Sequence, residues 1–201
     1  MSGIIIALAI VLVLPLFIAT WRTSLLGLSL QGAIMAWIVF HHGAHLSVES
    51  ALEFVDLVLV RTLAAPILLY RVLREKNAPA RNDVISPNLL SWTIAFALVL
   101  VGFRVADALV PEGDTQMLIA VAASALLLGL LVLATRTGPI SQIVGALRIE
   151  NALAMFELGL RPHHTAIGLR VGQLVIFAAT VGFFQFYLRA LPSELEAKQV
   201  T

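Results

Sequence analysis

The sequence predicts an all-α fold, a polytopic bundle of transmembrane helices that forms a single domain over residues 1–201. Two features of its composition predict this fold: 60% of the 201 residues are hydrophobic and only 12% are charged. A water-soluble globule needs more polar surface than this. The third observation is the pattern: apolar runs of about 20 residues, long enough to cross a bilayer core of roughly 30 Å, alternate with short polar breaks.

Seven membrane spans are predicted from apolar stretches bounded by Pro, Gly and charged residues. They lie near residues 3–20, 24–42, 51–73, 88–110, 117–135, 139–160 and 165–190. The longest connection runs only from Arg74 to Pro87, so no extramembrane domain is expected. The sequence also has no phosphate-binding loop, nucleophile elbow or HExxH pattern, and we therefore expect no catalytic residues in this chain.

The distribution of Lys and Arg predicts the orientation in the membrane. With seven crossings, one face receives eight basic residues and the other receives only Arg161. The eight are Arg22, Arg71, Arg74, Lys76, Arg81, Arg136, Arg189 and Lys198. The positive-inside rule therefore places the N-terminus outside and the C-terminus in the cytoplasm, as expected for a protein of a bacterial cytoplasmic (inner) membrane.

Charge and cysteine content exclude several classes of function. A net charge of +1 gives no basic surface for nucleic acid. The absence of Cys excludes disulfides and thiolate ligands for iron–sulfur clusters, and we expect no cofactor. Histidines gather in two connections on the predicted outer face, but no carboxylate lies in register with them, so we assign no metal site. They are His41, His42, His45, His163 and His164.

The candidate functional residues are polar and charged side chains inside the predicted spans. An ionisable group in hydrocarbon costs at least about 2.5 kcal/mol, so each one needs a partner, a water-filled cavity or a function. We interpret them as a proton path through the third, fourth, sixth and seventh spans. In chain order they are Asp56, Arg61, Arg104, Asp107, Arg148, Glu150, Asn151, Glu157, Arg170 and Gln173.

Helix rise predicts that these charges form two layers, since each residue advances about 1.5 Å along the axis. The layer near the midplane contains Arg61, Arg148 and Glu150. The layer nearer the outer face contains Asp56, Arg104, Glu157 and Arg170. Because neighbouring spans run in opposite directions and still bring opposite charges to similar depths, we expect internal pairing between helices.

Helical periodicity constrains the sixth span further. Glu150 and Glu157 are seven residues apart and therefore share a face, whereas Arg148 points roughly 200° away from Glu150. A helix with charges on two faces must meet protein or water on both. We therefore expect the sixth span to be surrounded by other helices.

For several residues a structural role competes with the functional one. Arg104 and Asp107 are three residues apart and are expected to form an ion pair near a helix end. Glu53 lies in the first turn of its span, where the helix dipole favours an anion. Gly168 and Gly172 form a GxxxG pattern, which lets two helices approach closely.

The run QIVGALRIENALAMFELG, from Gln142 to Gly159, resembles the hydrogenase-4 component E (HyfE) family of membrane subunits. The resemblance rests on the Gly145, Glu150 and Asn151 core, on the seven-span layout, and on the run RTLAAP that begins at Arg61. That family is related to the three-helix subunits NuoK of respiratory complex I and MrpC of sodium/proton antiporters. The last three spans of this chain correspond to such a unit.

The resemblance implies a membrane subunit of a machine that couples a redox reaction to proton or sodium movement. Glu150 would take the role of the buried carboxylate, about one helical turn from its place in the complex I subunit. The chain departs from the pattern in three ways: Arg61 replaces a common lysine, Arg148 is an additional cation, and Gly172 and Gln173 stand where a second buried acid is expected. Either the proton path runs through Arg170 and Glu157 instead, or this subunit is a structural link.

The leading hypothesis is thus a non-catalytic, cofactor-free subunit of a complex I-like assembly of the group 4 membrane-bound hydrogenase type. Its expected partners are antiporter-like and other membrane subunits, together with the lipid bilayer. A stand-alone secondary transporter is the first alternative and should show inverted repeats or broken helices. A purely architectural adaptor, whose charges are paired and inert, is the second.

Overall fold

The computed structural model describes residues 2–17, 20–41, 48–76, 89–136, 138–160 and 167–191, and each of the seven predicted spans is helical in it. Six spans are single α-helices whose bounds lie within a few residues of the predicted ones: α1 (Ser2–Phe17), α2 (Trp21–His41), α5 (Leu89–Leu109), α6 (Asp114–Thr135), α7 (Pro139–Leu160) and α8 (Ile167–Ala190). The third span consists of α3 (Val48–Phe54), the π-helix η1 (Val55–Ala64) and α4 (Ala65–Glu75). The all-α prediction is confirmed.

Four of the described helices, α2, α5, α6 and α8, are long and apolar enough to cross a membrane. The other segments are shorter or more polar. The first helix has 16 residues, the third span is divided into three segments, and α7 carries Arg148, Glu150 and Glu157 in its interior. Length and composition therefore support an integral membrane protein with several crossings.

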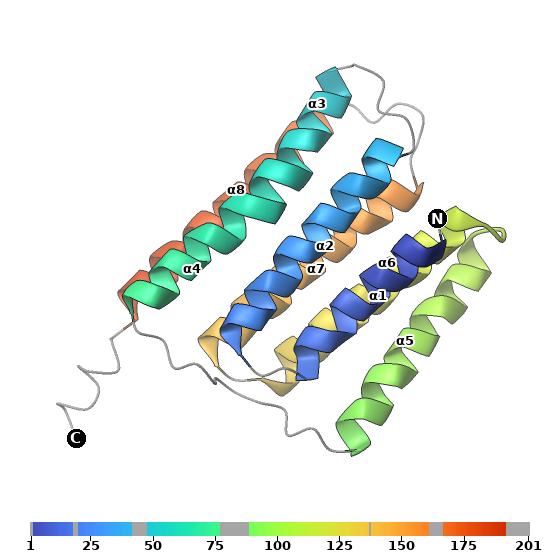
Figure 1. The fold of residues 1–201 in the computed structure, drawn as a ribbon, viewed down its shortest axis with the longest axis horizontal. Helices are drawn as coiled ribbons and strands as arrows, with labels where there is room; N and C mark the ends of the chain where they lie inside the picture. Colours follow the sequence, from blue (N-terminus) through green and yellow to red (C-terminus); the bar gives the residue numbers. More distant parts are fainter. Residues whose placement is uncertain are drawn as a thin grey trace.

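The helices form two layers (Figure 1). One layer contains α3, η1 and α4 followed by α2 and α1, and the layer behind it contains α8, α7 and α6, with α5 beside α6. In the middle of its layer, α7 packs against α6, α2 and α8. The sixth span therefore has neighbouring helices on three sides, as expected for its charged faces, while Leu153 on its remaining side is exposed.

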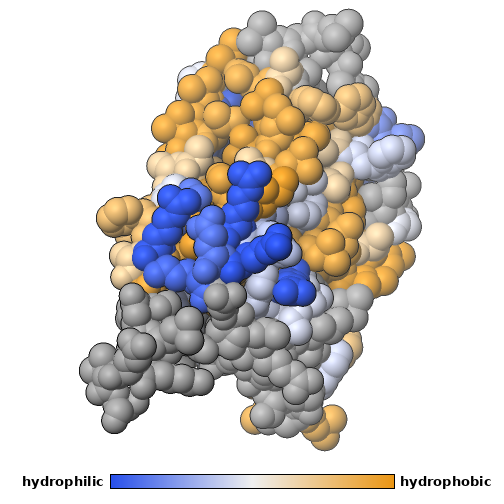
Figure 2. Space-filling view, turned by 60° about the vertical axis from the view of Figure 1, so that its left-hand side comes forward, coloured by the Kyte–Doolittle hydropathy of each residue, from blue (hydrophilic) through white to orange (hydrophobic). Residues whose placement is uncertain are grey.

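Basic side chains gather at one end of the bundle, which we call the basic end. The helix order places Arg22, Arg71, Arg74, Lys76, Arg136 and Arg189 there. Figure 2 shows hydrophilic residues at this end directly beside a broad apolar surface. This grouping agrees with the sorting of the charges by connection, while the orientation itself stays a prediction. Arg81, Arg161, Lys198 and the histidines other than His41 lie outside the described residues.

Small residues let the helices of the back layer pack closely. Gly102 of α5 faces Ser124 of α6, and a Cβ added at Gly102 would lie 2.7 Å from the Ser124 backbone nitrogen. The Ser124 hydroxyl donates a hydrogen bond of 2.7 Å to the carbonyl of Ala120. By contrast, Gly168 and Gly172 have no atom within 4 Å of an added Cβ, so the expected close approach at the GxxxG pattern does not occur within the described chain.

We predict that Gly102→Ala destabilises the bundle although alanine is the better helix former. The clash involves backbone, which cannot move without separating α5 from α6, and such overpacking costs about 1–3 kcal/mol. Gly182→Ala on α8 is the matched control, since nothing lies within 4 Å of its added Cβ. Thermal unfolding in detergent should show a lower midpoint for Gly102→Ala alone. Equal midpoints for the two variants would contradict the close packing of α5 on α6.

Candidate functional site

The π-helix η1 explains how the third span presents its charges. Residues five apart on an α-helix point about 140° from each other, whereas the i→i+5 bonding of a π-helix brings them to one face. Asp56 and Arg61 are such a pair, and the Arg61 Nε donates to Asp56 Oδ2 over 2.9 Å. The Thr62 hydroxyl likewise donates to the carbonyl of Leu57, five residues before it, over 2.6 Å.

The sequence contains a reason for wide turns at this point. Pro66 has no N–H and its ring would clash with the carbonyl of residue 62 in a regular α-helix. In the structure the N–H of Ala65 bonds the carbonyl of Val60, which is five residues before it. The backbone keeps right-handed helical angles at both ends of η1, so the third span is widened but continuous.

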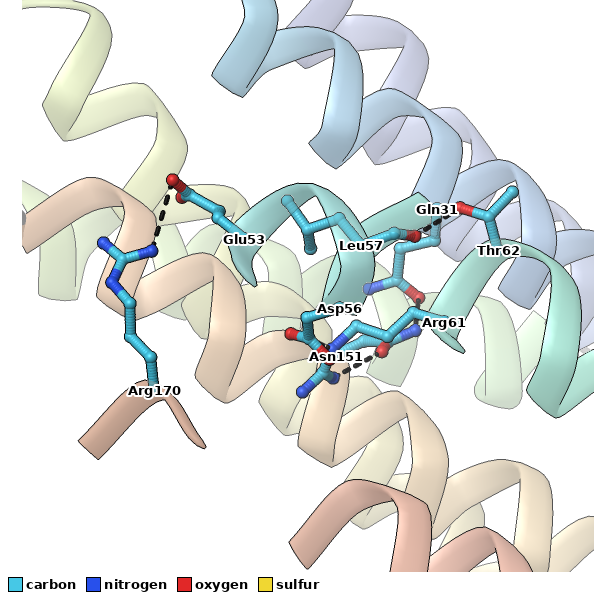
Figure 3. A network of polar contacts seen from close by, with 8 residues as sticks. All are labelled: Gln31, Glu53, Asp56, Leu57, Arg61, Thr62, Asn151 and Arg170. Carbon is cyan, nitrogen blue, oxygen red and sulfur yellow. Dashed lines mark hydrogen bonds and ion pairs between the residues drawn. The ribbon is translucent and has the colours of Figure 1, made fainter. Parts of the chain in front are cut away.

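Arg61 is the centre of a buried hydrogen-bonded network in the middle of the bundle (Figure 3). Its side chain is only 5% exposed, and its Nη1 donates to Asn151 Oδ1 of α7 over 2.9 Å. Asn151 Nδ2 in turn donates to Gln31 Oε1 of α2 over 3.4 Å. The guanidinium also lies 4.0 Å above the ring of Phe177 on α8. We call Asp56, Arg61, Asn151 and Gln31 the central network.

Gln31 is the member of the central network that the sequence analysis missed. It lies halfway along α2 and is 1% exposed. A glutamine in the middle of an otherwise apolar span is the signal that could have found it, because an amide in hydrocarbon needs a hydrogen-bond partner on a neighbouring helix. The structure thus adds the second span to the predicted polar path.

A polar cavity of about 40 Å³ adjoins the central network. Its polar lining comes from four elements: Glu53 of α3, Asp56 of η1, Glu157 of α7, and Arg170 and Gln173 of α8. Arg170 Nη1 lies 3.2 Å from Glu53 Oε2, which joins α8 to α3 (Figure 3). Glu53 therefore has a charged partner and does not depend on the helix dipole alone. Asp56 belongs to both the cavity and the central network, so the two are continuous.

Glu150 and Arg148 lie on different sides of α7, as the periodicity predicted. Glu150 is half-buried beside Thr180 of α8, with Arg61 and Asp56 as nearby charges. Arg148 is 4% exposed, and its Nη1 donates to the carbonyl of Leu12 on α1 over 3.2 Å. Arg148 is therefore held by a backbone carbonyl rather than by a carboxylate of the described chain.

The fourth span does not take part in the polar path, and this prediction is wrong. Arg104 and Asp107 are exposed on α5, which is separated from the central network by α6. No ion pair joins them in the described part of the chain, because Asp107 accepts a hydrogen bond of 2.9 Å from Gln116 instead. The error has a physical cause: depth was estimated from helix rise, which does not tell which helices are neighbours.

The polar cavity and the central network together reach from the end opposite the basic end to the middle of the bundle, and Arg148 is held apart from them against α1. Between the central network and the basic end lies a cluster of buried apolar side chains. It combines residues of α2, α4, α7 and α8, among them Leu25, Leu69, Val72, Ile143 and Leu147. The described helices therefore form a one-sided polar path.

Comparison of the chain with protein-family models, with curated proteins and with solved structures gives no match. The site must accordingly be interpreted from its own geometry.

We predict that Arg61→Met destabilises the protein by about 3–5 kcal/mol, because it leaves the Asp56 carboxylate buried without its cation. The double variant Arg61→Met/Asp56→Leu should recover most of this loss, since both charges are then removed. Arg104→Met, at an exposed cation, is the control and should change stability by less than about 0.5 kcal/mol. Unfolding free energies in mixed detergent titrations measure all three. A double variant no more stable than the single one would exclude Asp56 as the main partner.

Proposed function

We propose that this chain is a non-catalytic integral membrane subunit of a complex I-like, ion-translocating redox complex of the group 4 membrane-bound hydrogenase type. In this function the buried charges form part of a proton path, and the chain links antiporter-like subunits in the cytoplasmic membrane of a bacterium. Nickel, iron–sulfur clusters and substrate chemistry belong to its partners. The resemblance of residues 142–159 to the HyfE family supports the kind of complex.

The one-sided polar path is the observation that carries the proposal. Each charged side chain inside a membrane costs several kcal/mol of free energy, so such charges mark ion pathways. The polar path of this chain ends at Gln31 and Asn151. A cluster of buried apolar side chains lies between these two residues and the basic end. Ions that enter this path need a second component to cross the membrane, which is the arrangement expected of a subunit.

The described helices give less support to a stand-alone transporter. Such proteins bind their substrate at helices that are unwound near the midplane. The third span of this chain changes its pitch at η1 but keeps helical backbone angles throughout. The remaining described helices are single continuous segments.

Within this function, Glu150 exchanges a proton with water or with an adjacent antiporter-like subunit, and Arg61 and Arg148 adjust its affinity for the proton. The location of Glu150 on the α8 side of α7, near Arg61, supports this role. Glu157 lies on the same face of α7, about two helical turns from Glu150, and lines the polar cavity. A proton that enters at the cavity would therefore meet Glu157 first and Glu150 second.

Gentle extraction in detergent tests the assembly. We predict that the chain purifies in a large particle that contains antiporter-like subunits and an arm with nickel or iron–sulfur clusters. Native mass measurement and identification of every co-purifying chain provide the result. A lone monomer or a homo-oligomer would contradict the subunit function and favour the transporter.

Substitution in the assembled complex tests the proton path. We predict that Glu150→Gln reduces coupled ion translocation by on the order of 100-fold, the lower end of what a positioned proton-transfer group contributes. Redox activity with an artificial electron acceptor should persist, because the cofactors lie in other subunits. Glu112→Gln, an exposed carboxylate outside the helices, is the matched control. An assembled Glu150→Gln complex with unchanged translocation would support the architectural adaptor.

A further inference from the structure

We infer that the polar cavity between α3, η1, α7 and α8 is a water-filled access site, and that Glu157 is the group that exchanges protons with this water. The inference rests on the proposed function, because it identifies where protons enter the path. It identifies water as the ligand of the cavity. It also states that protons enter from the end of the bundle opposite the basic end.

The size and lining of the cavity fit water. A volume of about 40 Å³ exceeds the 10–15 Å³ that one water molecule needs, so two or three can be accommodated. Water also needs polar partners, and three buried polar atoms at the cavity residues have none: Asp56 Oδ1, Glu157 Oε1 and Arg170 Nε. Among the described residues, no group of three or more His, Asp or Glu side chains is placed to hold a metal ion. Water rather than a metal is therefore the ligand that this geometry favours.

The pairing of charges around the cavity identifies Glu157. Asp56 is held by Arg61, and Glu53 is held by Arg170. Protonation of either carboxylate would remove the negative charge that its arginine partner neutralises. No described cation forms an ion pair with Glu157, so this side chain can take up and release a proton while both ion pairs remain intact.

Within the described part of the chain, the other helices packed against α7 bring no further charge to this place. The helix α6 approaches Gly159 with the side chain of Ile119, and its only charged residue, Asp114, is exposed in its first turn. The charged residues of α2, Arg22 and His41, lie near its two ends. Among the described residues, the charged groups that line the cavity together with Glu157 are Glu53, Asp56 and Arg170.

The position of Glu157 along α7 shows from which end of the bundle the cavity is reached. Glu157 is three residues from the end of α7, which corresponds to about 5 Å along the axis. Asn151 lies about 1.7 turns deeper in the same helix and belongs to the central network. In the proton transfer, a hydronium ion in the cavity gives one proton to the Glu157 carboxylate, leaving a neutral water molecule and a carboxylic acid. The reverse step returns the proton to water.

Radical footprinting of the full chain in nanodiscs tests the water. Hydroxyl radicals produced from bound water by X-rays modify the side chains that touch it. Leu57 lines the cavity and is 3% exposed, whereas Leu147 is 1% exposed and lies in the apolar cluster toward the basic end. We expect Leu57 to be modified several-fold faster than Leu147. Equal rates would overturn the inference of a hydrated cavity.

Infrared spectroscopy of the same sample tests Glu157. We expect the wild-type chain to show a carboxylic acid C=O band that changes with pH and shifts in heavy water. Glu157→Gln should lose one component of this band, and Glu112→Gln and Glu150→Gln should both keep that component. Unchanged footprinting of Leu57 in Glu157→Gln shows that the variant is folded and its cavity hydrated. An unchanged band in Glu157→Gln, with every component retained, would overturn the assignment.

Both measurements use the isolated chain and do not depend on partners. A failed assignment of Glu157 therefore leaves the proposed assembly untouched. Conversely, purification of the chain as a lone monomer would refute the subunit function without affecting a hydrated cavity.

Discussion

The burial of the Arg61 guanidinium in the middle of the bundle is the constraint on which the arrangement depends. A cation at this depth must be surrounded by acceptors, and a single helix cannot supply them. Asp56 comes from the same span through a widened turn, and Asn151 comes from α7. The ring of Phe177 from α8 covers the guanidinium. One side chain thus determines the relative positions of three spans.

The π-helix is a consequence of the same requirement. Only a five-residue repeat brings the Asp56 carboxylate to the face of η1 that Arg61 occupies. The helix α2 also approaches η1 closely at this widened segment, since a Cβ added at Gly32 would lie 3.1 Å from the Thr62 backbone nitrogen. Close approach at Gly32 brings Gln31, its neighbour, to Asn151. Local helix geometry and contact between layers are therefore coupled at one point.

The distribution of polar and apolar contacts along the bundle connects this packing with function. The polar cavity lies between the central network and the end opposite the basic end, and a cluster of buried leucine, isoleucine and valine side chains lies between the network and the basic end. In the proposed function, this asymmetry lets water and protons reach the centre from one side.

The sequence by itself determined the helices, because apolar runs bounded by Pro, Gly and charged residues mark their extent, and it located the charges within them. Periodicity along α7 also separated Arg148 from Glu150 correctly, since that property belongs to one helix. Only the tertiary structure decided that α2 contributes Gln31, that α5 with Arg104 and Asp107 is excluded, and that Asp56 pairs with Arg61 across a π-turn. These features depend on which helices are neighbours and on local pitch, and both follow from packing between helices rather than from hydropathy.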